Sequence, residues 1–452
     1  MNYSRWATRE EMQKKLIAAN LETGVEKSGL PLMYDDKYLY LDTSPAHNLL
    51  IGCVGSGKTQ AVILPMLKLS MMAGESIVIN DPKGEIYEKT AQKLEDEGYK
   101  NIVINLDDPR LGNNWNPLDL AYKLYKEDNK DKALELIEDL GYYLFSDNEK
   151  VETDPFWVNT TINYFSGLAL YLFNNAKKEE INLSSIASLA NSLLDKKESD
   201  EFLNKVEKNS VIFMKLAGTL QAPPETRGSI ISVFNQKIEK YISKENLANM
   251  LSSSDFDITT ISNEKTALFI VCGISSHSIN LIPLLANQVM DAVSLYGNKE
   301  KRLNMLMDEF DSLIPIKDFA LKLNYCRSIN IRMTVSILSF VHLANMYSKE
   351  DVEILKMCFG NIIYLLSEDI YTLEEISKNC GTHLVDGVEE ALVSIPELKT
   401  LGYFEAIILT TRTMPFKTKM LPDYQIDWGY EIKSKTIPTR ANNEIKIYKE
   451  EK

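Results

Sequence analysis

The feature that most constrains this chain is the segment Gly-Cys-Val-Gly-Ser-Gly-Lys-Thr at positions 52–59, which matches the phosphate-binding pattern GxxxxGK[ST]. The apolar run His47–Ile51 before it predicts a short buried strand, and the pattern from Lys58 to about Met72 predicts a helix. In this setting, backbone N–H groups converge on phosphate oxygens at a helix N-terminus. The sequence therefore predicts a nucleotide-binding α/β fold, the alternative being a chance glycine-rich turn.

The residues of this loop have separate expected roles. Glycines allow the backbone to approach the phosphates closely. Lys58 is expected to reach the β- and γ-phosphates, and the Thr59 hydroxyl to ligate Mg²⁺, so ATP and Mg²⁺ are the expected cofactors. The expected nucleotide-binding residues of this segment are Gly52, Gly55, Ser56, Gly57, Lys58, Thr59 and Gln60.

A second candidate segment lies at the end of another apolar run. Leu303–Met307 predicts a strand that leads directly into Asp308 and Glu309. Phosphoryl chemistry at a phosphate loop needs a carboxylate at the end of a neighbouring strand. Asp308 is therefore expected to hold Mg²⁺, partly through water, and Glu309 to orient or deprotonate the attacking water. The alternative is that these carboxylates merely open a solvated loop.

A third segment, Asp-Pro-Lys-Gly-Glu at positions 81–85, follows the predicted strand Ser76–Asn80. Ligands of open α/β sheets bind at the carboxyl ends of strands, so Asp81 and Lys83 are candidates for the nucleotide site. The alternative is a simple strand-to-helix turn, in which Asp81 caps the helix and Pro82 is its first residue.

Two arginines follow the acidic strand in sequence. Arg327 ends a predicted helix, and Arg332 begins the next predicted strand. Either could lie at a subunit edge and stabilise transition-state charge at a neighbour's γ-phosphate. The alternative is that they are ordinary surface arginines.

Composition narrows the function classes. The chain has 452 residues, of which 44% are hydrophobic and 25% charged, as expected for a globular protein with more than one domain. The formal net charge of −14 argues against a generic basic surface that coats nucleic acid, but it is compatible with a local basic lining. The five cysteines and four histidines are dispersed, without a zinc-binding constellation. No apolar run approaches the roughly 18 residues of a membrane helix and no signal peptide is visible, so we expect a soluble chain.

The periodicity of the chain changes twice. Alternating strand and helix patterns, typical of a mostly parallel sheet covered on both faces, are interrupted by a nearly all-helical stretch and then resume. The expected organisation is a lead-in at 1–45, a nucleotide-binding domain formed by 46–118 and 256–428, an inserted all-α domain at 119–255 and a flexible polar tail at 429–452.

With these pieces in order, the chain resembles the type IV secretion coupling proteins, the TraG/TraD-like ATPases of bacterial conjugation. The specific signal is the combination of GxxGSGKT, DPKGE and WNPL in one order and spacing. The matching stretches are Arg5–Thr8, His47–Thr59, Asp81–Glu85, Trp115–Leu118, Phe156–Trp157, Met307–Phe310 and the region of Gly381.

This resemblance implies a RecA-like P-loop NTPase domain with an inserted all-α domain, assembled as a homo-hexameric ring with ATP between subunits. It implies that ATP hydrolysis drives recruitment and translocation of a single-stranded DNA–relaxase substrate toward type IV secretion channel components. The implied location is the cytoplasmic face of the bacterial cell membrane, with membrane association through parts absent from this chain. By the same resemblance, Lys58 and Thr59 match the phosphate-loop pair, Asp308 and Glu309 the two carboxylates, and Arg327 the arginine finger.

The chain also departs from the family pattern. Leu338, followed by Ser339, stands where the family usually has a glutamine that senses the γ-phosphate, and His342 replaces a second common glutamine. This departure leaves a second hypothesis open, a nucleotide-binding docking platform with little turnover. A third is a DNA translocase outside secretion, against which the Trp115–Leu118 and Arg5–Thr8 matches count.

Overall fold

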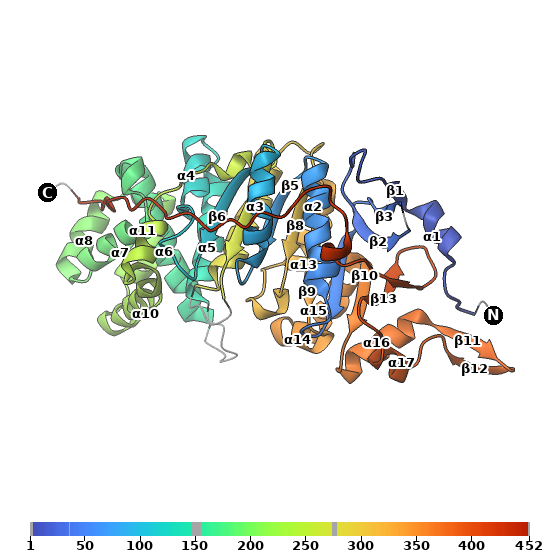
Figure 1. The fold of residues 1–452 in the computed structure, drawn as a ribbon. Coiled ribbons are helices and arrows are strands. Elements are labelled where there is room, and N and C mark those ends of the chain that lie inside the picture. The colour runs from blue at the N-terminus through green and yellow to red at the C-terminus, as the bar shows by residue number, and fades with distance from the viewer. Residues whose placement is uncertain (1–2, 36, 147–154, 274–277, 451–452) are drawn as a thin grey trace. The chain divides into compact units, whose positions relative to one another are not determined.

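The computed structural model describes residues 3–35, 37–146, 155–273 and 278–450, and the chain divides into two compact units (Figure 1). Unit 1 comprises Met1–Asn101, Thr260–Ile274 and Val293–Thr436, and unit 2 comprises Ile102–Thr259, Ser275–Ala292 and Ile437–Lys452. The sequence assigned 102–118 to the nucleotide-binding domain, but these residues belong to unit 2. The reason is visible at Trp115, whose backbone N–H donates to Met250, and at Asn114, which pairs with Asp255.

Unit 1 is built on a mostly parallel sheet in the order β14-β13-β10-β4-β9-β8-β5-β7, and β6 (Lys100–Asn105), whose first two residues belong to this unit, follows β7. The strands β13 and β14 are antiparallel to their neighbours, and the other described pairs are parallel. The central strands are buried along their whole length, as their continuous apolar runs indicate. The bounds are β4 (His47–Gly52), β5 (Ser76–Asn80), β7 (Thr266–Val271), β8 (Leu303–Met307), β9 (Ile331–Ile337), β10 (Phe359–Leu366), β13 (Glu405–Thr410) and β14 (Phe416–Lys419).

Helices cover both faces of this sheet. The connections through α2 (Leu64–Met72) and α3 (Glu85–Asp96) run from β4 toward β6, and these two helices lie side by side (Figure 1). The connections through α13 (Phe319–Ser328) and α15 (Lys349–Cys358) run in the opposite direction, so right-handed crossovers place this second pair on the other face. The predicted α/β class with a mostly parallel sheet is confirmed. Unit 1 also contains α14 (Phe340–Met346), α16 (Ile370–Cys380), α17 (Ile395–Lys399) and the hairpin β11 (Thr382–Val385) and β12 (Val388–Ala391).

The lead-in forms a small layer of its own. Helix α1 (Arg9–Lys15) begins with a capping box between Thr8 and Glu11. Strands β1 (Ile17–Ala19), β2 (Leu30–Tyr34) and β3 (Leu39–Asp42) form an antiparallel sheet in the order β1-β3-β2.

Unit 2 is almost entirely helical, as its three- and four-residue periodicity predicted. Helix α6 (Pro155–Asn175) packs against α5, α7, α9 and α10, and aromatic rings of Phe145, Phe165 and Phe234 meet in its core. Gly167 of α6 lies against α9, because a Cβ there would stand 2.6 Å from the Leu216 side chain. The remaining helices are α4 (Asp119–Lys126), α5 (Lys130–Phe145), α7 (Leu183–Ser192), α8 (Lys196–Lys205), α9 (Val211–Leu220), α10 (Pro224–Ile242) and α11 (Glu245–Met250), and α12 (Leu281–Tyr296) begins here and ends in unit 1.

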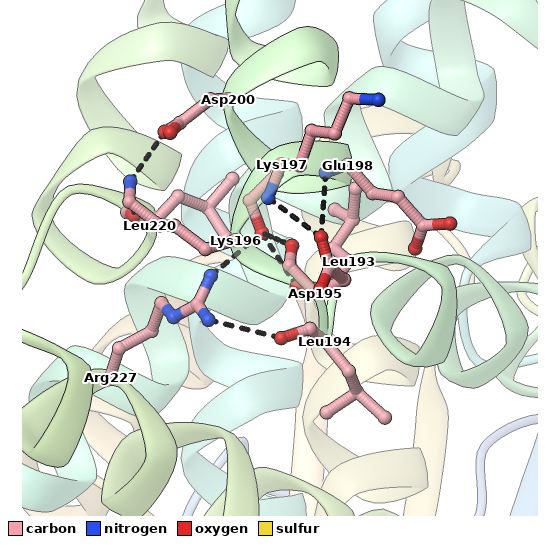
Figure 2. Close-up of polar contacts among 10 residues, drawn as sticks. Leu193, Leu194, Asp195, Lys196, Lys197, Glu198, Asp200, Leu220 and Arg227 are labelled. Carbon is pink, nitrogen blue, oxygen red and sulfur yellow. Dashed lines mark hydrogen bonds and ion pairs between the residues drawn. The ribbon is translucent and has the colours of Figure 1, made fainter.

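The turn between α7 and α8 shows how polar groups hold this bundle together (Figure 2). Asp195 caps α8 by accepting from the backbone N–H of Lys197 at 2.7 Å. The buried guanidinium of Arg227, from α10, donates to the carbonyl of Leu194 and to the hydroxyl of Ser199, both at 3.0 Å. The guanidinium therefore ties α10 to the end of one helix and the start of the next.

The C-terminal segment differs from the flexible tail that its polar composition predicted. Within unit 2, the buried Arg440 donates to the carbonyl of Pro109 at 2.9 Å and to Asn249 Oδ1 at 2.6 Å. Further along, the Tyr448 N–H donates to Ser185 Oγ at 2.9 Å. These contacts hold an extended segment that has no regular secondary structure of its own, which explains why local periodicity does not reveal it.

Every helix in the described part of the chain is too short or too polar to cross a lipid bilayer.

The close approach of α6 and α9 generates a prediction. Gly167→Leu should lower the free energy of unfolding by about 3 kcal/mol, because the new side chain overlaps buried Leu216. The matched control is Gly218→Leu in α9, where a Cβ meets nothing within 4 Å; it should be neutral or stabilising by about 0.5 kcal/mol. Urea unfolding of the two variants measures both values, and equal destabilisation would contradict the packing argument.

Candidate functional site

The phosphate-loop segment joins β4 to a short π-helical turn, η1 (Thr59–Ile63), that continues into α2. Gly52 has no room for a side chain, since a Cβ there would lie 2.3 Å from Ser56 Oγ. Gly57 has φ +92°, a conformation that other residues rarely adopt. The loop therefore closes tightly around the buried Ser56, while Val54 and Gly55 at its tip are exposed.

Lys58 is almost completely buried beside this loop, at 8% exposure. Its ammonium donates to the carbonyls of Gly52 and, at 3.2 Å, Cys53. Burial lowers the pKa of Lys58, and the charges of Asp308 and Asp311 oppose that lowering. A buried cation in a low-dielectric setting attracts a multiply charged anion, and a bound Mg²⁺ would offset the repulsion between that anion and the nearby carboxylates.

The two motif halves meet at Thr59 and Asp308. The Thr59 hydroxyl donates to Asp308 Oδ2 at 2.7 Å, although the residues are 249 positions apart in sequence. Strand β8 lies two positions from β4, with β9 between them, so the carboxyl ends of both strands lie at one edge of the sheet. A hydroxyl and a carboxylate in contact at this edge are ligands that suit Mg²⁺.

Two residues that sequence reasoning missed support Asp308. The Ser336 hydroxyl, near the end of β9, donates to Asp308 Oδ1, and Asn80 Nδ2, at the end of β5, donates to the Asp308 carbonyl at 2.6 Å. Asn80 and Ser336 are fully buried. The signal that could have found them is a polar side chain near the carboxyl end of each strand beside β8.

Two buried polar atoms lack a protein partner among the described residues: Ser56 Oγ in the loop and Oδ1 of Asn80, whose Nδ2 contacts Asp308. Burying such atoms without a hydrogen bond costs free energy. Unpartnered polar atoms in the loop and next to Asp308 fit a polar ligand, so the residues present suit a nucleotide and its metal ion.

Glu309 follows Asp308 in an uncommon backbone conformation, with φ +50°. Its N–H donates to Ser336 Oγ at 3.1 Å, which holds the turn in place. Positive φ in a residue other than glycine is a strained conformation that clusters at functional sites. The strain directs the chain away from β8 at the residue expected to contact the attacking water.

Asp81 and Lys83 lie in the same neighbourhood. A cavity of about 110 Å³ is lined by Thr59, Asp81, Lys83, Asp308 and Glu309, among others. Asp81 is buried, and it accepts from the N–H of Tyr87 in the first turn of α3 at 2.8 Å. Asp81 therefore holds the first turn of α3 and also lines the site, but α3 begins at Glu85 with Gly84 as its N-cap, so the alternative with Asp81 as cap and Pro82 as first helical residue is wrong. Burial raises the pKa of Asp81 to about 6.

Arg327 and Arg332 have different surroundings. Arg332 is 2% exposed and donates to Asn304 and Ser28, so it serves the core of unit 1. Arg327 is exposed and lies near His47 at the start of β4: burial lowers the pKa of His47, and the charge of Arg327 lowers it further. The phosphate loop begins at the other end of this six-residue strand, about 20 Å away.

A further buried carboxylate, Asp311, lies close to Lys58. Its Oδ2 accepts from the Leu338 N–H at 2.7 Å, at the position where the family's sensing glutamine was expected. Burial raises the pKa of Asp311, and hydrogen bonding from Leu338 and the charges of His342 and Lys58 oppose this rise. An acidic side chain, that of Asp311, therefore lies close to Lys58, where the family pattern predicted an amide.

Comparison with known proteins identifies the family. A family model described as Type IV secretory system Conjugative DNA transfer matches residues 1–419. The chain belongs to this family. The resemblance seen in the sequence is thereby confirmed.

Curated relatives of the conjugative DNA transfer family are distant in sequence. The type IV secretion system-coupling proteins VirD4 of Bartonella henselae and Bartonella quintana are each 20% identical to this chain, over 354 and 361 residues. The matches cover 76% of this chain and 54% of each relative. The chain therefore spans about half the length of the curated relatives it matches.

Several solved structures share the fold of this chain. The bacterial conjugative coupling protein TrwBdeltaN70 is 17% identical, with a TM-score of 0.68 and 93% of both chains covered. TrwB in complex with the non-hydrolysable ATP analogue ADPNP has a TM-score of 0.67, at 17% identity, covering 98% of this chain and 96% of that one. VirB4 of Thermoanaerobacter pseudethanolicus is more distant, with 11% identity and a TM-score of 0.53, covering 88% and 98%. The RecA-like fold with an inserted all-α domain is confirmed by these likenesses.

In this family member, the raised pKa of Asp81 predicts a pH effect on stability. Its pKa in the folded state, about 6, lies above the ordinary aspartate value. Between these two values, the folded state binds a proton at Asp81 that the unfolded chain has released. That contribution is present at low pH and is lost as pH rises through about 6, by on the order of 2 kcal/mol. Asp81→Asn keeps an acceptor for the Tyr87 N–H and should remove this loss. Urea unfolding at pH 5 and 7.5 compares the two proteins, and parallel pH profiles would contradict the assignment.

Proposed function

We propose that this chain is the coupling ATPase of a conjugative type IV secretion system, and that it binds and hydrolyses ATP with Mg²⁺. The observation that carries the proposal is the 2.7 Å contact between Thr59 and Asp308, which joins a phosphate loop to the acidic end of β8. TrwB, which shares this fold, has been solved with ADPNP and with ADP and Mg²⁺.

The residues present suit this cofactor pair. The tight loop at Gly52, the unpaired Ser56 Oγ and Asn80 Oδ1, and the Thr59–Asp308 contact together form a polar cradle at one edge of the sheet. Thr59 and Asp308 would hold Mg²⁺, which when bound neutralises charge on the phosphate oxygens.

The protein's own groups supply the remaining chemistry. The Lys58 ammonium binds the β- and γ-phosphates. Because Lys58 is buried, phosphates in contact with it are shielded from water. The Glu309 carboxylate orients the attacking water and accepts its proton. Ser336 and Asn80 keep Asp308 in position through the two hydrogen bonds described above.

Arg327 acts, in this proposal, on the nucleotide of a neighbouring subunit. Arg327 is exposed and lies about one strand length from the phosphate loop of its own subunit, so its side chain does not reach a nucleotide bound there. A homo-hexameric ring would bring one subunit's Arg327 to the next subunit's γ-phosphate, where an arginine stabilises transition-state charge. Each subunit's active site would then be incomplete without its neighbour.

The proposed substrate is single-stranded DNA joined to a relaxase, passed to the secretion channel at the cytoplasmic face of the cell membrane. The family's description as conjugative DNA transfer supports this role over a translocase outside secretion. A docking platform with little turnover is a second candidate, which the apolar Leu338 at the sensing position favours.

A substitution at Glu309 separates the two candidates. Glu309→Gln should bind MgATP within about twofold of the unsubstituted chain, while turnover falls by about 100-fold or more because the base is lost. The measurement is phosphate release with and without single-stranded DNA, alongside ATP affinity. Lys58→Ala is the control that should lose binding itself. A slow basal rate that Glu309→Gln leaves unchanged would favour the docking platform.

A mixing experiment tests Arg327. Lys58→Ala and Arg327→Ala should each abolish turnover alone, but an equal mixture should recover activity. Only a loop from one variant and an arginine from the other can form a complete site, which occurs at about a quarter of the interfaces of a randomly mixed ring. Arg110→Ala, at an exposed arginine that pairs with Asp108 in unit 2, should leave turnover unchanged. A mixture without activity would place Arg327 outside the neighbour's site.

A further inference from the structure

A buried histidine stands at the start of the strand that leads into the phosphate loop. His47, the first residue of β4, is 2% exposed. Its Nδ1 accepts from the backbone N–H of Met333 in β9 at 3.0 Å, and its Nε2 lies 2.7 Å from the carbonyl oxygen of Leu323 in α13. The imidazole therefore joins the sheet to a helix at the end of β4 that lies away from the loop.

The two partners determine which imidazole nitrogen carries the hydrogen. A backbone N–H can only donate, so Nδ1 is the acceptor toward Met333. A carbonyl can only accept, so Nε2 carries the hydrogen that is donated to Leu323. The ring is therefore neutral, with one nitrogen bonded to the sheet and the other to the helix. Burial lowers the pKa of His47 and outweighs the hydrogen bond to Leu323, which favours this neutral form.

The start of β4 is a fixed point for these contacts. Asn48 Nδ2 donates to Thr334 Oγ1 of β9, and Asn361 Nδ2 of β10 donates to Asn48 Oδ1, both at 2.9 Å. All three residues are buried. Because the strands on both sides hold the residue after His47, the imidazole projects from a rigid part of the sheet.

The carbonyl that His47 holds belongs to the turn of α13 that leads to Arg327. In an α-helix each carbonyl accepts from the N–H four residues later, and Arg327 comes four residues after Leu323. Leu323 and Cys326 are buried, whereas Arg327 is exposed. The contact with His47 thus holds the last turn of α13, from which Arg327 reaches the surface.

We propose that His47 is a positioning residue, and that its imidazole places Arg327 for the nucleotide of a neighbouring subunit. The proposal rests on the proposed function, because it requires Arg327 to act between subunits. Strand β4 then serves two nucleotide sites, since its carboxyl end leads into its own phosphate loop and its amino end holds the arginine. A group that stabilises transition-state charge has to be placed within about half an ångström. Loss of the contact should therefore slow turnover without weakening nucleotide binding.

Two substitutions separate the two contacts of the imidazole. The amide of asparagine reaches the position of Nδ1, and that of glutamine reaches the position of Nε2. His47→Asn keeps an acceptor for the Met333 N–H but loses the donor to Leu323, so turnover should fall at least about tenfold while MgATP affinity stays within about twofold. His47→Gln keeps that donor and should retain turnover within about threefold.

The measurements are phosphate release and calorimetric titration with MgATP, both on the full chain. The matched control is His383→Asn, at a half-buried histidine of β11, which should change neither turnover nor MgATP affinity.

Mixed rings decide whether the defect lies in the arginine or in the phosphate loop. His47→Asn subunits retain a working loop and Lys58→Ala subunits a correctly held arginine, so an equal mixture should recover turnover at about a quarter of the interfaces. An equal mixture of His47→Asn with Arg327→Ala should show no more turnover than the two variants measured separately, because neither supplies a positioned arginine. Damage to the loop that follows β4 would instead weaken MgATP binding and give the reverse pattern of recovery, which overturns the inference.

The remaining outcomes also distinguish this inference from the proposed function. If Lys58→Ala and Arg327→Ala show no recovery when mixed, the role of Arg327 in the proposed function fails, and this inference fails with it. If that mixture recovers but His47→Asn has full turnover, only the role of His47 is overturned. If His47→Asn shows no cooperative unfolding in urea, His47→Gln decides by itself: retained turnover supports the inference, and lost turnover in the folded variant overturns it.

Discussion

The hydrogen bond between Thr59 and Asp308 depends on a constraint of parallel sheets, that all strands end at the same edge. Strands β4 and β8 come from distant parts of the sequence, yet only β9 separates them. Their carboxyl ends therefore deliver a hydroxyl and a carboxylate to one point. The proposed chemistry at the phosphate loop requires this convergence, and no segment of the chain could supply both groups locally.

Two buried polar side chains support the site, and burying them without hydrogen-bond partners would cost free energy. Asn80 and Ser336 are buried polar residues near the ends of the two strands that flank β8, and both bond to Asp308. Glu309 adopts a strained backbone conformation at the adjacent position. A site of this kind places its carboxylates before any ligand arrives, which lowers the reorganisation that binding requires.

The strand order also gives unit 1 a polarity. The acidic groups lie at the carboxyl ends of the strands, where β4 leads into the phosphate loop, while Arg327 lies near the opposite end of β4. The exposed arginine is then available for a neighbour, so one sheet serves two active sites in the proposed ring.

The sequence by itself determined the phosphate loop, the strands around it and the acidic end of β8, because a loop motif and apolar periodicity are properties of neighbouring residues. It also located the all-α region, although residues 102–118 joined the helical unit instead of the nucleotide domain. Only the tertiary structure decided that Asn80 and Ser336 support Asp308, that Arg332 is buried, and that Arg440 fastens the polar C-terminal segment. Those roles follow from strand order and long-range packing, which join residues that no local pattern connects.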